Sequence, residues 1–247
     1  MSVQGMKILV TGASSGIGEH IAAFLASAGA HVAAAARRTD RLDALAATAG
    51  GKIAPVAMDV GDPESVKRGV AEAAEAMGGL NGLFNNAGIA WGGHALNMSE
   101  EDWTRVIDIN VNGVFRVATA CAPVIAENGG GAILNTASVL SFRPGEKVAA
   151  YSTSKAAVAH MTKNLALEWA SMGVRVNAIA PGYFPTEMTN PFLATPKGQA
   201  LTRNVPMGRF GIMHELEGPV ELLLGSRGSF ITGVTLPVDG GHLCQSV

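Results

Sequence analysis

The stretch MKILVTGASSGIGEHIAAFLASA, Met6 to Ala28, decides the fold of this chain. Its first part, Met6–Val10, is a short apolar run of large and β-branched residues, which is typical of a buried strand. The glycine-rich residues Thr11–Gly18 follow, and Glu19–Ala28 is rich in alanine and other helix-forming residues. The stretch therefore predicts a strand, a tight loop and a helix, in that order.

The same alternation of apolar strands and helices continues along the chain. Further strands are predicted at His31–Ala36, Ile53–Met58, Leu80–Asn85, Gly131–Thr136, Val174–Ala180 and Thr235–Val238. Helices are predicted between them at Asp40–Thr48, Ser65–Met77, Glu100–Ala122, Ala150–Ser171 and Glu215–Leu224. Because crossovers between parallel strands place helices on both faces of a sheet, this order predicts an α/β fold with a doubly wound (Rossmann) parallel sheet. A length of 247 residues with 48% hydrophobic content suits a single domain spanning residues 1–247.

One segment, Tyr183–Gly211, departs from this rhythm. It carries four prolines, Pro185, Pro191, Pro196 and Pro206. Long irregular segments are uncommon inside compact domains and often serve as active-site lids. We therefore expect this segment to form a lid over a substrate site.

Charge and composition exclude several classes of protein. Eighteen basic and twenty acidic residues give a formal charge of −2, so no overall field favours nucleic acid or anionic lipid. Met1–Met6 lacks the features of a secretory signal, and no apolar run reaches the about 20 residues that span a bilayer. Neither the two cysteines, Cys121 and Cys244, nor the six histidines show the spacing of a metal site. We expect a cytoplasmic protein with no metal and no nucleic-acid or membrane partner.

The glycine-rich loop is a candidate dinucleotide site. Gly12, Gly16 and Gly18 follow a G-x3-G-x-G spacing, which differs from the commonest dinucleotide fingerprint. Glycine permits tight turning and close backbone approach, and the N-terminus of the following helix favours a pyrophosphate. Taken alone, the motif also fits a simple turn from strand to helix. Its place after the first strand of a doubly wound sheet favours the cofactor interpretation.

The end of the second predicted strand bears on the choice of cofactor. An NAD site commonly has an acidic residue there to bind the ribose 2′-hydroxyl, whereas this chain has Ala36 followed by Arg37 and Arg38. Guanidinium groups match a 2′-phosphate in charge and in bidentate geometry. The sequence thus favours NADP(H) over NAD(H), the alternative being that both arginines are solvated residues at a helix start.

Tyr151 and Lys155 lie four residues apart in a predicted helix, which places both side chains on one face. A free tyrosine has a pKa near 10, and an adjacent ammonium lowers that pKa by favouring the phenolate. Such a pair is a candidate acid–base group. Taken alone, the same four-residue spacing is also typical of two side chains that lie together on an ordinary helix surface.

Several motifs in order resemble the short-chain dehydrogenase/reductase family in its single-domain form. They are TGASSGIG at Thr11–Gly18, Asp59-Val60, NNAG at Asn85–Gly88, Asn110, Ser138, YSTSK at Tyr151–Lys155, Pro181-Gly182, and ITG and DGG near the carboxyl terminus. The resemblance covers nearly the whole chain and implies an NAD(P)-dependent enzyme acting on CH–OH donors. It also implies a homotetramer, with interfaces formed by the helices at 100–122 and 150–171 and by the last strand.

The resemblance implies roles for four residues. Tyr151 would give a proton to a ketone or accept one from an alcohol, and Ser138 would hydrogen-bond the same oxygen. Lys155 would hold the nicotinamide ribose and lower the Tyr151 pKa. Asn110 would position a water that links Lys155 to solvent.

The resemblance also implies a set of cofactor-binding residues. Asp59 and Val60 would lie at the adenine ring, and Phe184 and Thr186 at the nicotinamide carboxamide. The NNAG motif either binds the cofactor or stabilises the central strand. The complete set is Gly12, Ser14, Ser15, Gly16, Ile17, Gly18, Arg37, Arg38, Asp59, Val60, Asn86, Ala87, Gly88, Tyr151, Lys155, Pro181, Gly182, Phe184 and Thr186.

The substrate is expected to be a small ketone or secondary alcohol with an apolar arm. The family members that this chain resembles include 3-oxoacyl reductases, gluconate dehydrogenase-like enzymes and carbonyl reductases. The alternatives are an NAD(H)-dependent alcohol dehydrogenase of the same family and a non-catalytic NADP(H)-binding sensor, although no residue of the catalytic set is missing. Candidate substrate-pocket residues are Trp91, His94, Val139, Leu140, Phe142, Tyr183, Phe192 and Leu193.

Overall fold

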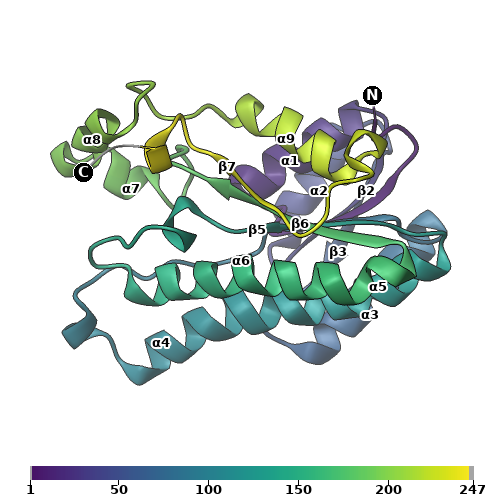
Figure 1. Cartoon of the computed structure of the whole chain (residues 1–247). Helices are drawn as coiled ribbons and strands as arrows, with labels where there is room; N and C mark the ends of the chain where they lie inside the picture. Colours follow the sequence, from purple (N-terminus) through teal and green to yellow (C-terminus); the bar gives the residue numbers. More distant parts are fainter. Residues whose placement is uncertain (1, 245–247) are drawn as a thin grey trace.

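The computed structural model describes residues 2–244 and shows a seven-stranded sheet in the order β3-β2-β1-β4-β5-β6-β7 (Figure 1). Every neighbouring pair of strands is parallel. The chain winds outward from β1 in both directions, so the carboxyl ends of β1 and β4 flank the crevice where such sheets bind ligands. The strands are β1 Lys7–Thr11, β2 His31–Ala36, β3 Ile53–Ala57, β4 Gly82–Asn85, β5 Gly131–Thr136, β6 Val174–Pro181 and β7 Thr235–Val238.

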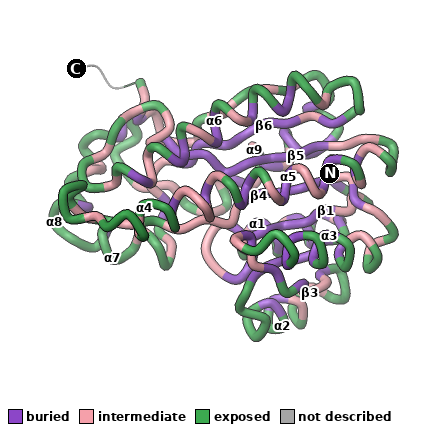
Figure 2. The backbone as a smooth tube through the Cα atoms, turned by 90° about the horizontal axis from the view of Figure 1, so that it is seen from below, coloured by how far each residue is buried: buried purple, intermediate pink, exposed green. Residues whose placement is uncertain are grey.

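Helices cover both faces of the sheet, as the sequence predicts. The helices are α1 Gly16–Ser27, α2 Thr39–Ala47, α3 Pro63–Met77, α4 Glu100–Ile107, α5 Gly113–Glu127, α6 Ala149–Trp169, α7 Asn190–Leu193, α8 Pro196–Ala200 and α9 Glu217–Leu224. Alternate residues of β1 show the two-sided burial: Ile8 and Val10 pack with α1 and α9, whereas Leu9 packs with α3 and α5. The buried strands and the exposed outer helix faces are visible in Figure 2.

Three predicted strands, at 31–36, 131–136 and 235–238, have the bounds of β2, β5 and β7. The other predicted bounds differ from the observed ones by at most two residues, except in two helices. The first helix begins at Gly16 rather than Glu19, because glycines fit the tight turn that opens α1. The helix predicted at Glu100–Ala122 continues to Glu127 and contains a π-helical turn at Asp108–Asn112.

The helical run Glu100–Glu127 is long and apolar enough to cross a membrane by length and composition. Its apolar residues Val117, Cys121 and Ile125 are fully buried among the side chains of the sheet. A core helix of a soluble protein passes the same test, and this packing is that of a core helix.

The segment Tyr183–Gly211 is more regular than the sequence suggested. It contains α7, α8 and a 3-10 turn at Leu201–Asn204. Pro191 and Pro196 start α7 and α8, where proline's missing N–H costs no helical hydrogen bond. The expectation of an irregular loop was therefore wrong, and the lid role remains a prediction.

Candidate functional site

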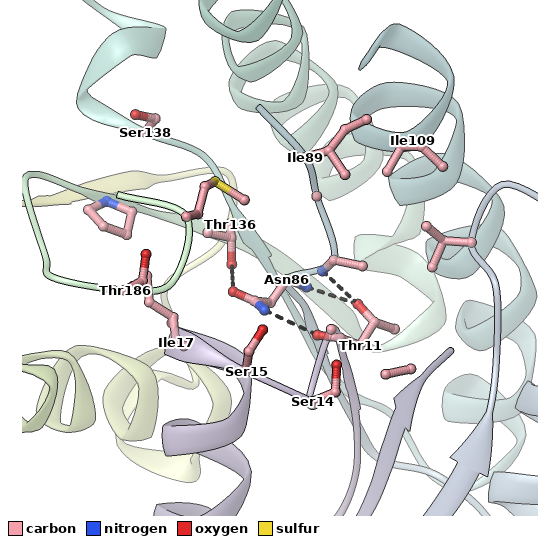
Figure 3. Close-up of a pocket in the computed structure, with 18 of the residues that line it drawn as sticks. Thr11, Ser14, Ser15, Ile17, Asn86, Ile89, Ile109, Thr136, Ser138 and Thr186 are labelled. Atoms are coloured by element: carbon pink, nitrogen blue, oxygen red, sulfur yellow. Dashed lines mark hydrogen bonds between the residues drawn. The ribbon is translucent and has the colours of Figure 1, made fainter. Parts of the chain in front are cut away.

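A cleft of about 310 Å³ opens at the carboxyl ends of the parallel strands (Figure 3). Its size is at the lower end of the range of small-molecule sites. Gly18 and Asn110, which the sequence also singled out, do not line it. The cleft is lined by the other expected site residues: Gly12, Ser14, Ser15, Gly16, Ile17, Arg37, Arg38, Asp59, Val60, Asn86, Ala87, Gly88, Ser138, Tyr151, Lys155, Pro181, Gly182, Phe184 and Thr186.

The glycine loop forms the floor of one end of the cleft. Gly12 and Gly16 have φ values of +67° and +58°, and residues with a side chain rarely adopt such values. A Cβ atom at Gly12 would lie 2.9 Å from the Cα of Ala87, and one at Gly18 would collide with the Gly12 carbonyl oxygen. Gly18 is therefore needed for the close approach of α1 to the loop after β1, and its contact with a cofactor remains a prediction. The N-terminus of α1, whose first N–H groups have no helical partners, faces the same end.

The NNAG motif is fixed by hydrogen bonds across three strands. The Thr11 hydroxyl accepts from the backbone N–H of Asn86 at 3.0 Å and of Ala87 at 3.1 Å. The Asn86 amide donates to the Thr11 carbonyl at 3.2 Å and accepts from Thr136 at 3.4 Å (Figure 3). Asn85 is buried and donates to the Val114 carbonyl at 2.8 Å. The first asparagine is thus structural, and the rest of the motif lines the cleft.

Guanidinium groups gather at the end of β2. Arg38 donates from Nε to the Ser14 hydroxyl at 3.1 Å and from Nη2 to the Ser15 hydroxyl at 2.7 Å. Arg37 turns the other way, with Nη1 3.9 Å from Asp59 Oδ2. Arg41, which sequence reasoning missed, lies one turn into α2 and pairs with Glu187 at 2.6 Å. Arg38 is therefore better placed than Arg37 to meet an anion above the glycine loop.

Tyr151 and Lys155 meet at the other end of the cleft. Both lie on α6, and the Lys155 Nζ atom is 5.7 Å from the centroid of the Tyr151 ring. Nζ donates a 2.7 Å hydrogen bond to the Thr136 carbonyl at the end of β5. Lys155 is almost fully buried, and this burial lowers its pKa to about 8.

The pKa of Tyr151 differs from the sequence-based expectation. Burial raises it above its ordinary value, and a hydrogen bond with Ser138 acts weakly in the opposite direction. The sequence predicted that Lys155 lowers the pKa of Tyr151, and this lowering is not found. Burial disfavours the charged phenolate, and the Lys155 ammonium donates its hydrogen bond to the Thr136 carbonyl. Ser138 and Tyr151 thus face each other in the cleft, as expected, but the phenol is a weaker acid than the sequence suggested.

Asn110 is buried behind the cleft, in the π-helical turn. Its Oδ1 accepts from the Ile89 N–H at 2.8 Å, and its Nδ2 donates to the Ile89 carbonyl at 2.8 Å and to Ser154 at 3.0 Å. The Ser154 hydroxyl donates in turn to the Tyr151 carbonyl at 2.7 Å. A Cβ atom at Gly88 would lie 3.2 Å from Asn110 Oδ1 and 3.6 Å from Lys155 Nζ. Asn110 thus connects the loop after β4 to the helix that carries Tyr151.

Ser141 is a site residue that sequence reasoning missed. Its hydroxyl accepts from the Ser138 N–H at 3.2 Å and donates to the Lys155 carbonyl at 2.8 Å. It therefore links the loop that presents Ser138 to the helix that presents Lys155. Ser141 follows Ser138 by three residues, which is the spacing of a capping box. This spacing was the feature of the sequence that could have indicated its role.

The expected substrate-pocket residues do not line this cleft. Val139 and Leu193 are buried, Phe142 and Phe192 are about half exposed, and Tyr183 packs edge-on against His242 with ring centroids 5.3 Å apart. Tyr183 lines a second hollow of about 120 Å³ instead. The expected substrate pocket therefore lies outside this cleft and remains a prediction. The cleft residues outside the expected catalytic and cofactor-binding sets are Thr11, Ala35, Ala36, Met58, Ile89, Arg105, Ile109, Thr136, Ala137, Met188 and Thr189.

Comparison with known proteins decides the family. A family model described as enoyl-(acyl carrier protein) reductase matches residues 12–242. The chain is 36% identical to the 3-oxoacyl-(acyl-carrier-protein) reductase FabG of Thermotoga maritima, covering 98% of this chain and 99% of that protein. The chain belongs to the short-chain dehydrogenase/reductase family. It is also 39% identical to gluconate 5-dehydrogenase of Gluconobacter oxydans, covering 97% of this chain and 95% of that protein.

Solved structures of this short-chain dehydrogenase/reductase fold match over almost the whole chain. A gluconate 5-dehydrogenase from Burkholderia cenocepacia in complex with NADP and tartrate has a TM-score of 0.94 and 32% identity, covering 98% of this chain and 97% of that chain. A 3-ketoacyl-(acyl-carrier-protein) reductase from Brucella melitensis complexed with NADH has a TM-score of 0.92 and 33% identity, covering 98% and 99%. The chain is therefore an oxidoreductase that uses a nicotinamide cofactor and acts on hydroxyl or ketone substrates.

Proposed function

We propose that this enzyme transfers a hydride between NADP(H) and a small ketone or secondary alcohol, with Tyr151 as the proton donor or acceptor. The observation that carries the proposal is the layout of one cleft. The guanidinium group of Arg38 lies at one end, above the glycine loop, and Ser138, Tyr151 and Lys155 lie together at the other. A dinucleotide has the same polarity, with its phosphates at one end and its reactive ring at the other.

The residues of the cleft fit a dinucleotide. The loop holds Gly12 and Gly16 at positive φ, and a side chain at Gly12 would meet the backbone of Ala87. The glycine loop and the N-terminus of α1 would hold the pyrophosphate. Asp59 and Val60 would flank the adenine, and Pro181, Gly182, Phe184 and Thr186 would hold the nicotinamide end. When bound, the nicotinamide supplies or accepts the hydride at the substrate carbon.

Each catalytic residue has a role that its position supports. In the reducing direction, Tyr151 Oη gives its proton to the substrate oxygen as the oxygen becomes negative, and Ser138 donates a hydrogen bond to the same oxygen. We propose that Lys155, whose Nζ atom lies 5.7 Å from the centroid of the Tyr151 ring, holds the nicotinamide ribose beside the reacting groups. Oxidation runs these proton steps in reverse. Asn110 holds the backbone around Ile89, and we propose that it also positions the water through which the proton is replaced.

The preference for NADP(H) rests on the guanidinium groups at the end of β2. No carboxylate lies at Ala36, the last residue of β2, to hold a ribose 2′-hydroxyl, and Arg38 lies beside Ser14 and Ser15. Arg37 Nη1 lies 3.9 Å from Asp59 Oδ2, away from Ser14 and Ser15. Arg38 therefore supplies most of the positive charge for a 2′-phosphate, and Arg37 supplies a smaller part. Related structures contain either NADP or NADH, which is why the preference must be measured on this chain.

A panel of substrates tests the proposal. Ketones, 3-oxoacyl thioesters and sugar acids are each offered with NADPH or NADH, and the absorbance of the reduced cofactor is followed. We expect turnover with at least one class and a higher kcat/KM with NADPH. Equal kcat/KM with both cofactors at one salt concentration would refute the NADP(H) preference, and no turnover with any class would contradict the substrate proposal.

We also propose a cytoplasmic homotetramer. Large apolar side chains are exposed on the helices and next to the strand expected at the interfaces: Trp103 on α4, Phe115 on α5, Leu167 on α6 and Phe230 just before β7. Phe230 is fully exposed in the isolated chain. We expect the tetramer to cover these side chains. Light scattering at micromolar concentration should give the mass of four chains, and Phe230→Asp should lower it; a monomer in the unmodified protein would contradict the proposal.

A further inference from the structure

A carboxylate from the segment after β6 lies against the guanidinium groups of the cofactor cleft. Glu187 Oε1 is 2.6 Å from Arg41 Nη1, and its Oε2 is 3.4 Å from Arg38 Nη1. The two arginines come from the start of α2, and Glu187 follows Thr186, which lies over the glycine loop beside Ile17 (Figure 3). The contact therefore joins the segment after β6 to the two arginines that we propose bind the 2′-phosphate on the ribose of NADP(H).

The charges around this contact are nearly balanced. Three guanidinium groups, on Arg37, Arg38 and Arg41, pair with two carboxylates, on Asp59 and Glu187. Two further carboxylates, on Glu19 and Asp40, lie near enough to act on Arg41 electrostatically. The Arg41 guanidinium lowers the pKa of the Glu187 carboxyl, which is therefore ionised at neutral pH. The side chains of Glu187, Arg38 and Arg41 are each about half exposed, so an added anion can reach them from solvent.

The donors of Arg38 and Arg41 suit a phosphate as well as a carboxylate. Arg38 already spans the hydroxyls of Ser14 and Ser15, and Arg41 Nη1 is 3.4 Å from the Ser14 carbonyl. A phosphate placed above Ser14 would meet two guanidinium groups and two hydroxyls, which is a typical anion site. The carboxylate of Glu187 contacts the same guanidinium groups that such a phosphate needs.

We propose that Glu187 is a specificity-determining residue that competes with the 2′-phosphate of NADP(H) for Arg38 and Arg41. This inference rests on the proposed preference for NADP(H), and it adds Arg41 to the phosphate-binding set. A cofactor without the 2′-phosphate does not need these guanidinium groups. Glu187 therefore lowers the affinity of the enzyme for NADP(H) and leaves its affinity for NAD(H) unchanged. The ratio of the two affinities is smaller than it would be without this carboxylate.

The test measures binding alone, by titration calorimetry of the full-length protein with 2′,5′-ADP and with 5′-AMP, which lacks only the 2′-phosphate, at one salt concentration. Glu187→Gln keeps the size of the side chain and removes its charge. Exposed ion pairs have modest energies, so we expect the Kd for 2′,5′-ADP to fall about two- to fivefold and the Kd for 5′-AMP to stay unchanged. Adding Arg41→Gln to Glu187→Gln should remove most of this gain.

Glu146→Gln is a matched control. Glu146 is exposed and pairs with Lys197 of α8 at 2.8 Å, so the change also removes one negative charge and one ion pair to the segment after β6. It should leave both Kd values unchanged. The inference is overturned if Glu187→Gln leaves the 2′,5′-ADP affinity as it was, or if it changes the affinity for both ligands, or if Glu146→Gln gives the same gain. If the unmodified protein binds both ligands equally, the proposed NADP(H) preference fails first, which distinguishes the two failures.

Discussion

Replacing Lys155 by methionine should change how the free energy of unfolding depends on pH. Burial lowers the Lys155 pKa from its ordinary value of 10.5 to about 8 in the folded chain. Between these two values the unfolded chain binds more protons than the folded chain. The contribution of Lys155 to stability therefore rises with pH across this window and is absent below it.

The magnitude follows from the two pKa values. A difference of about 2.5 pKa units corresponds to about 3 kcal/mol over the whole window, of which roughly 1 kcal/mol develops between pH 7 and pH 9. Cys121 acts in the opposite direction, because burial raises its pKa to about 12 and the unfolded thiol ionises first. Comparing the variant with the unmodified protein cancels the Cys121 contribution and leaves that of Lys155.

Urea denaturation at pH 7, 8 and 9 measures this difference. We expect the stability of Lys155→Met relative to the unmodified protein to fall by roughly 1 kcal/mol from pH 7 to pH 9. Lys163→Met, at an exposed position on the same helix, is the matched control and should show no such trend. A relative stability that is flat with pH would refute the idea that the burial of Lys155 disfavours its charge.

Three further substitutions test other parts of the site. Arg38→Ala should raise the KM for NADPH about tenfold or more and leave that for NADH nearly unchanged, because charge-assisted hydrogen bonds contribute about 1.5–3 kcal/mol; equal effects on both cofactors would contradict this role. Gly18→Ala should lower the free energy of unfolding by about 1–3 kcal/mol in a denaturant titration, since its Cβ collides with the Gly12 carbonyl, and an unchanged midpoint would disprove the close packing. Ser141→Ala should lower kcat about tenfold with little change in cofactor KM, and Ser141→Thr should restore it; an unchanged kcat in the alanine variant would show that the hydrogen bonds to Ser138 and Lys155 do not position them.

The sequence predicted the features that local patterns determine. Apolar runs placed every strand of the sheet, and β2 ends at Ala36 as expected, which supports the assignment of the arginines that follow. The spacing of Tyr151 and Lys155 put both on one face of α6, and their motif order indicated the family. These inferences succeeded because each depends on residues close together in the chain or on the order of whole motifs.

The features that the sequence did not predict depend on contacts between distant residues. The Arg41–Glu187 pair joins positions 146 residues apart. The pKa of Tyr151 was expected to fall, yet burial raises it, and the extent of burial is known only once α6, β5 and the Ser138 loop pack together. Apolar character does not show which way a loop side chain points, so the sequence did not predict that Phe142 and Phe192 are about half exposed.

The most direct test of the central claim is turnover by Tyr151→Phe with NADPH and a ketone that the unmodified protein reduces. The change removes only the phenolic oxygen, so the Kd for NADPH, measured by fluorescence titration, should stay within a few-fold. The kcat should fall about 10²- to 10⁴-fold, the usual contribution of a positioned general acid. Near-normal kcat with an unchanged Kd would contradict the assignment of Tyr151 as the proton donor and, with it, the mechanism proposed for this enzyme.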